Sequence, residues 1–211
     1  CVHWHTARIS QSGHIENMVR IMHLHETLSK VSRTFAISIE QLPMELRDAV
    51  TIAYLLFRVS DCLEDSEQLE ASQKSELLRL WAKVLAGHTP VSSLTNAVAH
   101  LDENDSEVYV TQHADQLLDE FHKLPEPNQE TIAHHVHQTS LGMARWQDHG
   151  PYVETEEEMD DYMFEVAGRV GYMLTRIFAW HYAPIRGVAD ELMGYFVPAA
   201  EHLRNDTGLP I

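Results

Sequence analysis

Residues 45–63, ELRDAVTIAYLLFRVSDCL, decide the fold class, because their apolar side chains recur on every side of a helix. These side chains are Leu46, Ala49, Val50, Ile52, Ala53, Leu55, Leu56 and Val59. A helix that is apolar all round is buried in a protein core. Pro43 followed by Glu45 suits the first turn of such a helix. We therefore expect a central, buried helix over this stretch.

Helical patterns account for most of the remaining chain, and no Asn-Gly hairpin signal appears. Thr155 and Glu158 form a capping-box pattern ahead of one of these helices, and Pro198 predicts a kink in the last. The sequence thus predicts an all-α, single-domain helical bundle spanning residues 1–211. The further helices expected are 14–39, 72–86, 92–99, 108–122, 129–147, 159–180 and 191–203.

The composition is that of an ordinary globular protein, with 44% hydrophobic and 22% charged residues. The formal net charge of −17 argues against nucleic acid as a partner, since phosphate backbones require a basic face. The two cysteines, Cys1 and Cys62, provide no disulfide framework, which favours a reducing compartment. The 15 histidines lack the spacing of a zinc site.

Membrane contact is not visible in this sequence. The apolar run from Ala49 to Phe57 is interrupted by Thr51 and is far shorter than the roughly 20 residues that cross a bilayer. The first residues show no signal peptide, although the chain does not begin with Met. We expect a cytoplasmic location, or membrane association through a segment not present here, and the sequence does not indicate an oligomeric state.

The run Asp61-Cys62-Leu63-Glu64-Asp65 places three carboxylates on nearly one helix face. Like charges at this spacing repel by a few tenths of a kcal/mol per pair, roughly, in an exposed helix. Mg²⁺ would relieve the repulsion, because it takes one or two carboxylates together with phosphate oxygens and water. The alternative is a solvated acidic helix end that continues through Glu67 and Glu70.

Motifs in order along the chain resemble the squalene/phytoene synthase family, and its squalene synthase branch more than its phytoene synthase branch. The motifs are SRTFA (32–36), QLPMELRDAV (41–50), AYLLFRVSDCLED (53–65), LGMA (141–144), YMFEVAGRVG (162–171), LTRIF (174–178) and, weakly, MGYF (193–196). The resemblance implies an all-α bundle of the isoprenoid synthase type, which agrees with the helical pattern.

The resemblance also implies roles for individual residues. Tyr54, Tyr162 and Arg58 match catalytic positions, although a core tyrosine is the alternative for Tyr54. Diphosphate contacts fall on Ser32, Arg33, Arg58 and Arg176, and Mg²⁺ ligands on Asp61, Glu64 and Asp65. The prenyl channel would involve Phe35, Leu141, Gly142, Ala167, Gly168 and Gly171, where close helix packing alone is the alternative reading of the glycines.

The sequence departs from the family pattern at the second acidic cluster. Asn205 and Asp206 stand at the corresponding place and are the candidate metal ligands there, but Leu209 and Pro210 follow where another carboxylate is expected. Three explanations stay open: helices beyond Ile211, a divergent enzyme with one metal cluster, or a non-catalytic protein on the same fold. The first predicts an intact gene product heavier than 24.1 kDa.

The activity implied by the resemblance is the Mg²⁺-dependent, head-to-head coupling of two prenyl diphosphates, expected to be farnesyl diphosphate, with release of pyrophosphate. Reduction of the product to a squalene-like hydrocarbon would need NADPH, and no glycine-rich nucleotide motif is visible. The alternatives are a class I terpene cyclase acting on one prenyl diphosphate and a non-catalytic binding or assembly protein.

Overall fold

The computed structural model describes residues 24–182, and within that range the regular structure is entirely helical. A helical segment over residues 24–31 precedes the labelled helices. These are α2 (Arg33–Glu40), α3 (Met44–Asp65), α4 (Ala71–Leu85), α5 (Ser92–Val98), α6 (Ser106–Gln112), α7 (Ala114–Phe121), α8 (Glu126–His149), α9 (Glu156–Met163) and α10 (Arg169–His181), with a π-helical turn, η1 (Phe164–Gly168), before α10. The all-α prediction is confirmed. The helix predicted over 191–203, with Pro198, lies outside the described residues.

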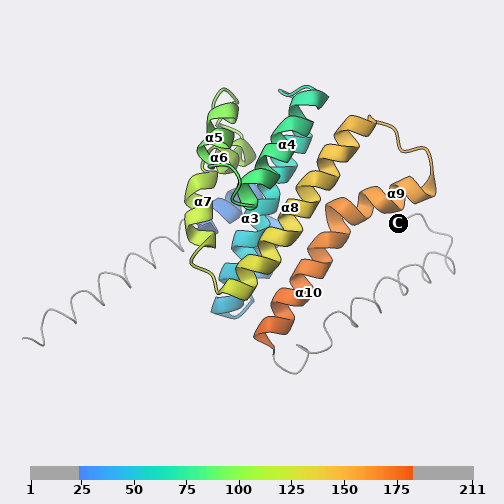
Figure 1. The fold of residues 1–211 in the computed structure, drawn as a ribbon. Coiled ribbons are helices and arrows are strands. Elements are labelled where there is room, and N and C mark those ends of the chain that lie inside the picture. Colours follow the sequence, from blue (N-terminus) through green and yellow to red (C-terminus); the bar gives the residue numbers. More distant parts are fainter. Residues whose placement is uncertain (1–23, 183–211) are drawn as a thin grey trace, which may run out of the picture.

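Helix α3 is the centre of the bundle, as predicted. Helices α4, α8 and α10 run side by side across one face of α3, and α5, α6 and α7 gather at its flank (Figure 1). Side chains on all sides of α3 are buried, including Ala53, Leu56 and Val59, each 0% exposed. A buried polar contact to α8 joins the hydroxyls of Ser60 and Ser140 at 2.9 Å. Every functional side chain on α3 is therefore held by a helix that the core fixes in place.

Two of the predicted helices are interrupted. The helix expected over 14–39 breaks at Ser32, whose backbone is extended and whose Oγ accepts a hydrogen bond from the N–H of Phe35 as the N-cap of α2. The helix expected over 108–122 breaks at His113, which separates α6 from α7. There the ring Nδ1 of His113 lies 2.8 Å from the carbonyl oxygen of Tyr109. Side chains that bond nearby backbone compete with continued helix, and the apolar pattern does not reveal this.

The helix predicted over 159–180 instead consists of α9, the π turn η1 and α10. The predicted cap at Thr155 is confirmed, because its Oγ1 accepts a hydrogen bond from the N–H of Glu158 at 3.1 Å, but the helix begins at Glu156, three residues earlier than predicted. A π turn leaves backbone groups without their usual partner four residues away, and here Thr139 Oγ1 donates to the carbonyl oxygen of Glu165 at 3.1 Å. The sequence pattern gives no sign of this hydrogen bond between α8 and η1.

In the described part of the chain, none of the helices combines the length and the apolar composition that crossing a membrane requires. Helix α8 has 24 residues and α3 has 22, but α3 carries charged side chains at both ends and Arg58 within it. Its apolar surface is covered by the neighbouring helices of the bundle.

Truncating the core of α3 should be costly. Leu56→Ala removes a side chain that is 0% exposed, so the free energy of unfolding should fall by about 2–5 kcal/mol, measured by urea denaturation. Ile37→Ala is the control, because Ile37 is 65% exposed and its loss should change stability by less than about 0.5 kcal/mol. Equal losses in the two variants would contradict a central position for α3.

Candidate active site

The last turn of α3 carries Asp61, Glu64 and Asp65, here called the acidic cluster. Glu64 is only 8% exposed, and its pKa rises to about 7, first because burial disfavours the charged form and then because of the negative charges of Asp65 and Asp61. Burial likewise raises the pKa of Asp61, against the lowering influence of Arg58. A helix C-terminus already has partial negative charge. The arrangement is therefore electrostatically unfavourable until a cation joins it.

Arg58 lies one turn before the acidic cluster and is held between two carboxylates. Its Nη1 donates to Oδ2 of Asp61 at 2.8 Å, and its Nη2 donates to Oε1 of Glu107, at the start of α6. The guanidinium Nε is buried, with no hydrogen-bond partner in the described part of the chain. Arg58 thus has donor capacity left for a further acceptor, and an arginine fork is well suited to phosphate oxygens.

Beside Arg58 lies a cavity of about 510 Å³ between α2, α3, η1 and α10, here called the α3 cavity. Its walls are mainly apolar, and its charged groups are Arg58 and Asp61. The lining residues are Phe35, Ser38, Ile39, Leu42, Val50, Tyr54, Phe57, Arg58, Asp61, Val166, Ala167, Val170, Met173, Leu174 and Phe178. A cavity with an apolar body and charged groups beside an acidic cluster suits an amphiphile with a long hydrocarbon chain and an anionic head.

The two candidate tyrosines lie on different sides of this arrangement. Tyr54 lines the α3 cavity, with its ring 5.1 Å from that of Phe35. The pKa of Tyr162 is raised, first by burial and then by the charges of the acidic cluster, so α9 brings this phenol close to the end of α3. The ring of Trp146 meets Tyr162 edge-on at 5.6 Å. Tyr54 therefore lies at the α3 cavity, and Tyr162 lies near the acidic cluster.

The carboxylates suit a metal that arrives with its own oxygen ligands. Residues 24–182 contain no group of three His, Cys, Asp or Glu side chains placed to hold a metal by themselves. Mg²⁺ does not need one, because it is commonly held by one or two carboxylates with substrate phosphate oxygens and water. Asp61 and Asp65, one helical turn apart, provide hard oxygen donors of this kind, and the excess negative charge favours a cation. The other candidates, Asn205 and Asp206, lie outside the described residues.

Three of the predicted diphosphate ligands do not line the α3 cavity. Ser32 accepts the N-cap hydrogen bond of α2. Arg33 lines a separate, open hollow together with His25 and Lys30. Arg176 is exposed on α10, on the side toward α8, where its charge is a lesser contribution to lowering the pKa of buried His135 to about 4, after burial itself and His134. Of the predicted diphosphate ligands, the structure brings only Arg58 together with the acidic cluster.

The predicted channel residues also separate into two groups. Phe35 and Ala167 line the α3 cavity. Gly142 instead lies beneath the side chain of Glu165, and Gly168 lies against the ring of Phe164. Leu141 is 38% exposed, and Gly171 has open space where a Cβ would be. Close approach of side chains, rather than channel lining, is therefore what Gly142 and Gly168 permit in this structure.

Sequence reasoning missed two acidic residues near the site. Glu107, the second partner of Arg58, lies 49 positions away along the chain. Glu165 is buried next to Gly142, where it pairs with Arg169. The spacing of Glu165 and Arg169, four residues apart, is a helical ion-pair signal that could have been noticed. No local pattern links Glu107 to Arg58.

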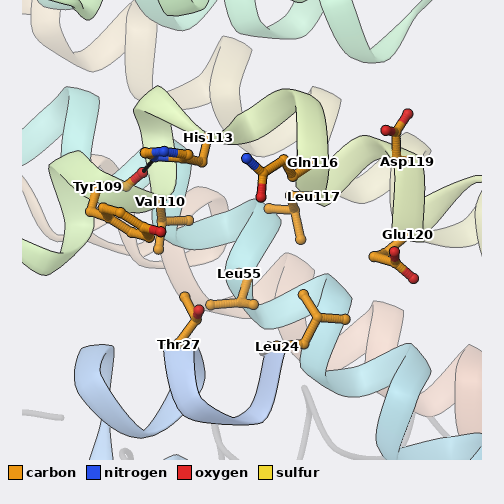
Figure 2. Close-up of a pocket in the computed structure, with 10 residues that line it drawn as sticks. All are labelled: Leu24, Thr27, Leu55, Tyr109, Val110, His113, Gln116, Leu117, Asp119 and Glu120. Atoms are coloured by element: carbon orange, nitrogen blue, oxygen red, sulfur yellow. Dashed lines mark hydrogen bonds between the residues drawn. The ribbon is translucent and has the colours of Figure 1, made fainter. Parts of the chain in front are cut away.

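A second hollow, of about 410 Å³, shares no lining residue with the α3 cavity. Figure 2 shows Leu24 and Thr27 on the helical segment 24–31 facing α6 and α7, with Leu55 of α3 between them. Its polar side chains include Gln116, Asp119 and Glu120. It has no arginine or lysine in its lining and so lacks the positive charge that would hold an anionic head group.

Comparison with known proteins identifies the family and the fold. The squalene/phytoene synthase family matches residues 28–205. The chain belongs to this family. Squalene synthase BSS of Botryococcus braunii is 33% identical over 185 residues, which cover 88% of this chain and 36% of that protein. The squalene synthase of Saccharomyces cerevisiae is 35% identical over 161 residues, covering 74% of this chain and 35% of that protein.

A solved structure described as the complex of TcSQS with the ligand BPH1237 superposes with a TM-score of 0.63 at 25% identity, covering 77% of this chain and 45% of that one. The bundle is therefore the all-α fold of squalene synthases, the isoprenoid synthase fold. The chain spans about a third of the length of the curated relatives quoted above.

Glu64 gives a prediction about pH. The pKa of Glu64 rises from 4.5 to about 7 on folding, so the folded protein binds the carboxyl proton more tightly than the unfolded chain does. The free energy of unfolding therefore falls as pH rises through that interval. Glu64→Gln should remove this loss, which is at most about 3 kcal/mol by pH 8 without Mg²⁺. Urea denaturation between pH 5 and 8 measures it, with Glu76→Gln on α4 as an exposed control. If the wild type and Glu64→Gln differed by the same free energy of unfolding at every pH from 5 to 8, the raised pKa of buried Glu64 would be refuted.

Proposed function

We propose that the chain forms the substrate-ionising part of a Mg²⁺-dependent prenyltransferase that joins two prenyl diphosphates, expected to be farnesyl diphosphate, head to head and releases pyrophosphate. The observation that carries the proposal is the α3 cavity, whose apolar walls adjoin Arg58 and Asp61. Membership of the squalene/phytoene synthase family supports it, as does the acidic cluster at the same end of α3. The substrate class, the reaction and the roles of the residues are parts of this proposal.

The prenyl tail would lie along the apolar wall formed by Val50, Phe57 and Val166, where it is withdrawn from water. Its diphosphate would lie at Arg58. Because Arg58 is paired with Asp61 and Glu107, the diphosphate must either use the unpaired Nε or replace one of these carboxylates. Replacement would free Asp61 for a metal. Substrate and metal would then bind cooperatively, since the diphosphate would free Asp61 for the metal and the metal would hold Asp61 away from Arg58.

Ionisation breaks the bond between C1 of the prenyl group and the diphosphate oxygen, and the electron pair leaves with the pyrophosphate. Bound Mg²⁺, held by Asp61 and Asp65, would neutralise the charge that develops on this leaving group. Arg58 would stabilise the same charge by charge-assisted hydrogen bonds. The ring of Tyr54, in the cavity wall, can face the allylic cation and stabilise it by about 0.5–2 kcal/mol.

The cation would next be captured by a double bond of the second substrate, and the new carbocation would lose a proton as a cyclopropane ring closes. Reduction of the coupled product would require NADPH, which remains a proposed cofactor. Tyr162, near the acidic cluster, would act on groups at the metal end of the site rather than deep in the cavity. This division gives the two tyrosines separate proposed roles, one at the hydrocarbon and one near the leaving group.

The acidic cluster is tested by Asp61→Asn and Asp65→Asn in the intact gene product. Each should reduce Mg²⁺-dependent release of pyrophosphate from farnesyl diphosphate by at least about a hundredfold, the size of effect seen when a charge-stabilising group is removed from an active site. Glu67→Gln is the matched control, since it removes an exposed acid two residues beyond the cluster. Full turnover in both asparagine variants would defeat the proposal.

The product distinguishes coupling from cyclisation, which the same ionising site could also begin. Incubation with farnesyl diphosphate and Mg²⁺, followed by mass spectrometry, should give a hydrocarbon or diphosphate product that contains two farnesyl chains. A product with a single chain would identify a terpene cyclase instead. No product and no binding of a non-hydrolysable prenyl analogue would favour a non-catalytic protein.

A further inference from the structure

Glu165 is a carboxylate that the proposed reaction does not use, although it is buried beside the α3 cavity. It belongs to the π turn η1 and is 7% exposed. Two nitrogens of Arg169 donate hydrogen bonds to this carboxylate: Nε lies 2.5 Å from Oε2, and Nη2 lies 3.0 Å from Oε1. Arg145 of α8 approaches the same carboxylate at 3.5 Å and also pairs with Asp161 at 2.7 Å. The carboxylate thus links α10 to α8 by charge.

The backbone of α8 is shaped to receive this carboxylate. A Cβ at position 142 would lie 2.7 Å from Cγ of Glu165 and closer still to its carboxylate, so only glycine leaves room for the side chain as it stands. One turn earlier on α8, Thr139 donates to the carbonyl oxygen of Glu165. Both the side chain and the backbone of Glu165 are therefore fixed to α8, at the residue where the helix widens into a π turn.

The residues that follow Glu165 form a wall of the α3 cavity. Val166, Ala167 and Val170 line it opposite α2 and α3. A π turn shifts the direction of every later side chain on its helix relative to a continuous α-helix. With Glu165 anchored toward α8, Val166 and Ala167 point to the cavity. Loss of the anchor would allow η1 to return to α-helical geometry and would move this wall.

We propose that Glu165, held by Arg169 and Arg145 over Gly142, is a positioning residue that fixes the π turn and so sets the cavity wall against which the prenyl tail packs. The role in tail binding rests on the proposed function, whereas the anchoring of the π turn does not. Glu165 is not expected to touch substrate. Its effect should therefore appear in the affinity for the hydrocarbon tail and not in the affinity for the diphosphate head.

The anchor is tested by a double-mutant cycle on Gly142. In the wild type, Gly142→Ala should lower the melting temperature, because its methyl group collides with a side chain that Arg169 prevents from moving. In the Glu165→Ala background the same change should raise the melting temperature, because alanine is the better helix former and the obstacle is gone. The same change of melting temperature on Gly142→Ala in both backgrounds would contradict the anchoring of Glu165 to α8.

The role in tail binding is tested by Glu165→Gln in the intact gene product, with Glu76→Gln as the control. We expect a several-fold higher KM for farnesyl diphosphate, while inhibition by inorganic pyrophosphate, which has no tail, is unchanged. An unchanged KM in an active enzyme would overturn this inference and leave the proposed function intact. An equal loss of affinity for pyrophosphate would also overturn it. If the wild type ionises no prenyl diphosphate, the proposed function fails, and the role in tail binding fails with it.

Discussion

The structure depends on the burial of charge at the end of its central helix. Helix α3 is fixed by the core along most of its length, so the acids in its last turn cannot move apart to relieve their repulsion. Burial first, and then the negative charges of Asp65 and Asp61, raise the pKa of Glu64. Arg58 offsets part of this charge and is itself shared with Glu107. The fold thus maintains a local excess of negative charge that a cation would stabilise.

The same helix joins the charged groups to the hydrocarbon part of the site. Tyr54, Phe57 and Asp61 all line the α3 cavity, so successive turns of one rigid helix present aromatic, apolar and anionic groups to a ligand. A ligand whose polar head and apolar tail are joined would be held at both ends by the same element. This is why the position of the opposite wall, formed by η1 and α10, matters for how well a tail of given length fits.

The sequence was sufficient to predict the all-α fold, the buried position of α3 and the common face of Asp61, Glu64 and Asp65, because these follow from helical periodicity alone. It was insufficient where a distant group decides the local geometry. The π turn accepts a hydrogen bond from Thr139 of another helix, and the second partner of Arg58 lies on α6. Gly142 was predicted to line the channel because small residues can do so, but its neighbour Glu165 became apparent only from the packed structure.

The central claim is that the end of α3 and its adjoining cavity bind metal and prenyl diphosphate together. Calorimetric titration of the intact gene product with farnesyl thiodiphosphate, with and without Mg²⁺, tests it most directly. The account predicts strong binding only when Mg²⁺ is present, and weak binding of farnesol under either condition. Binding of farnesyl thiodiphosphate that is equally strong without Mg²⁺, or that farnesol matches, would contradict the account.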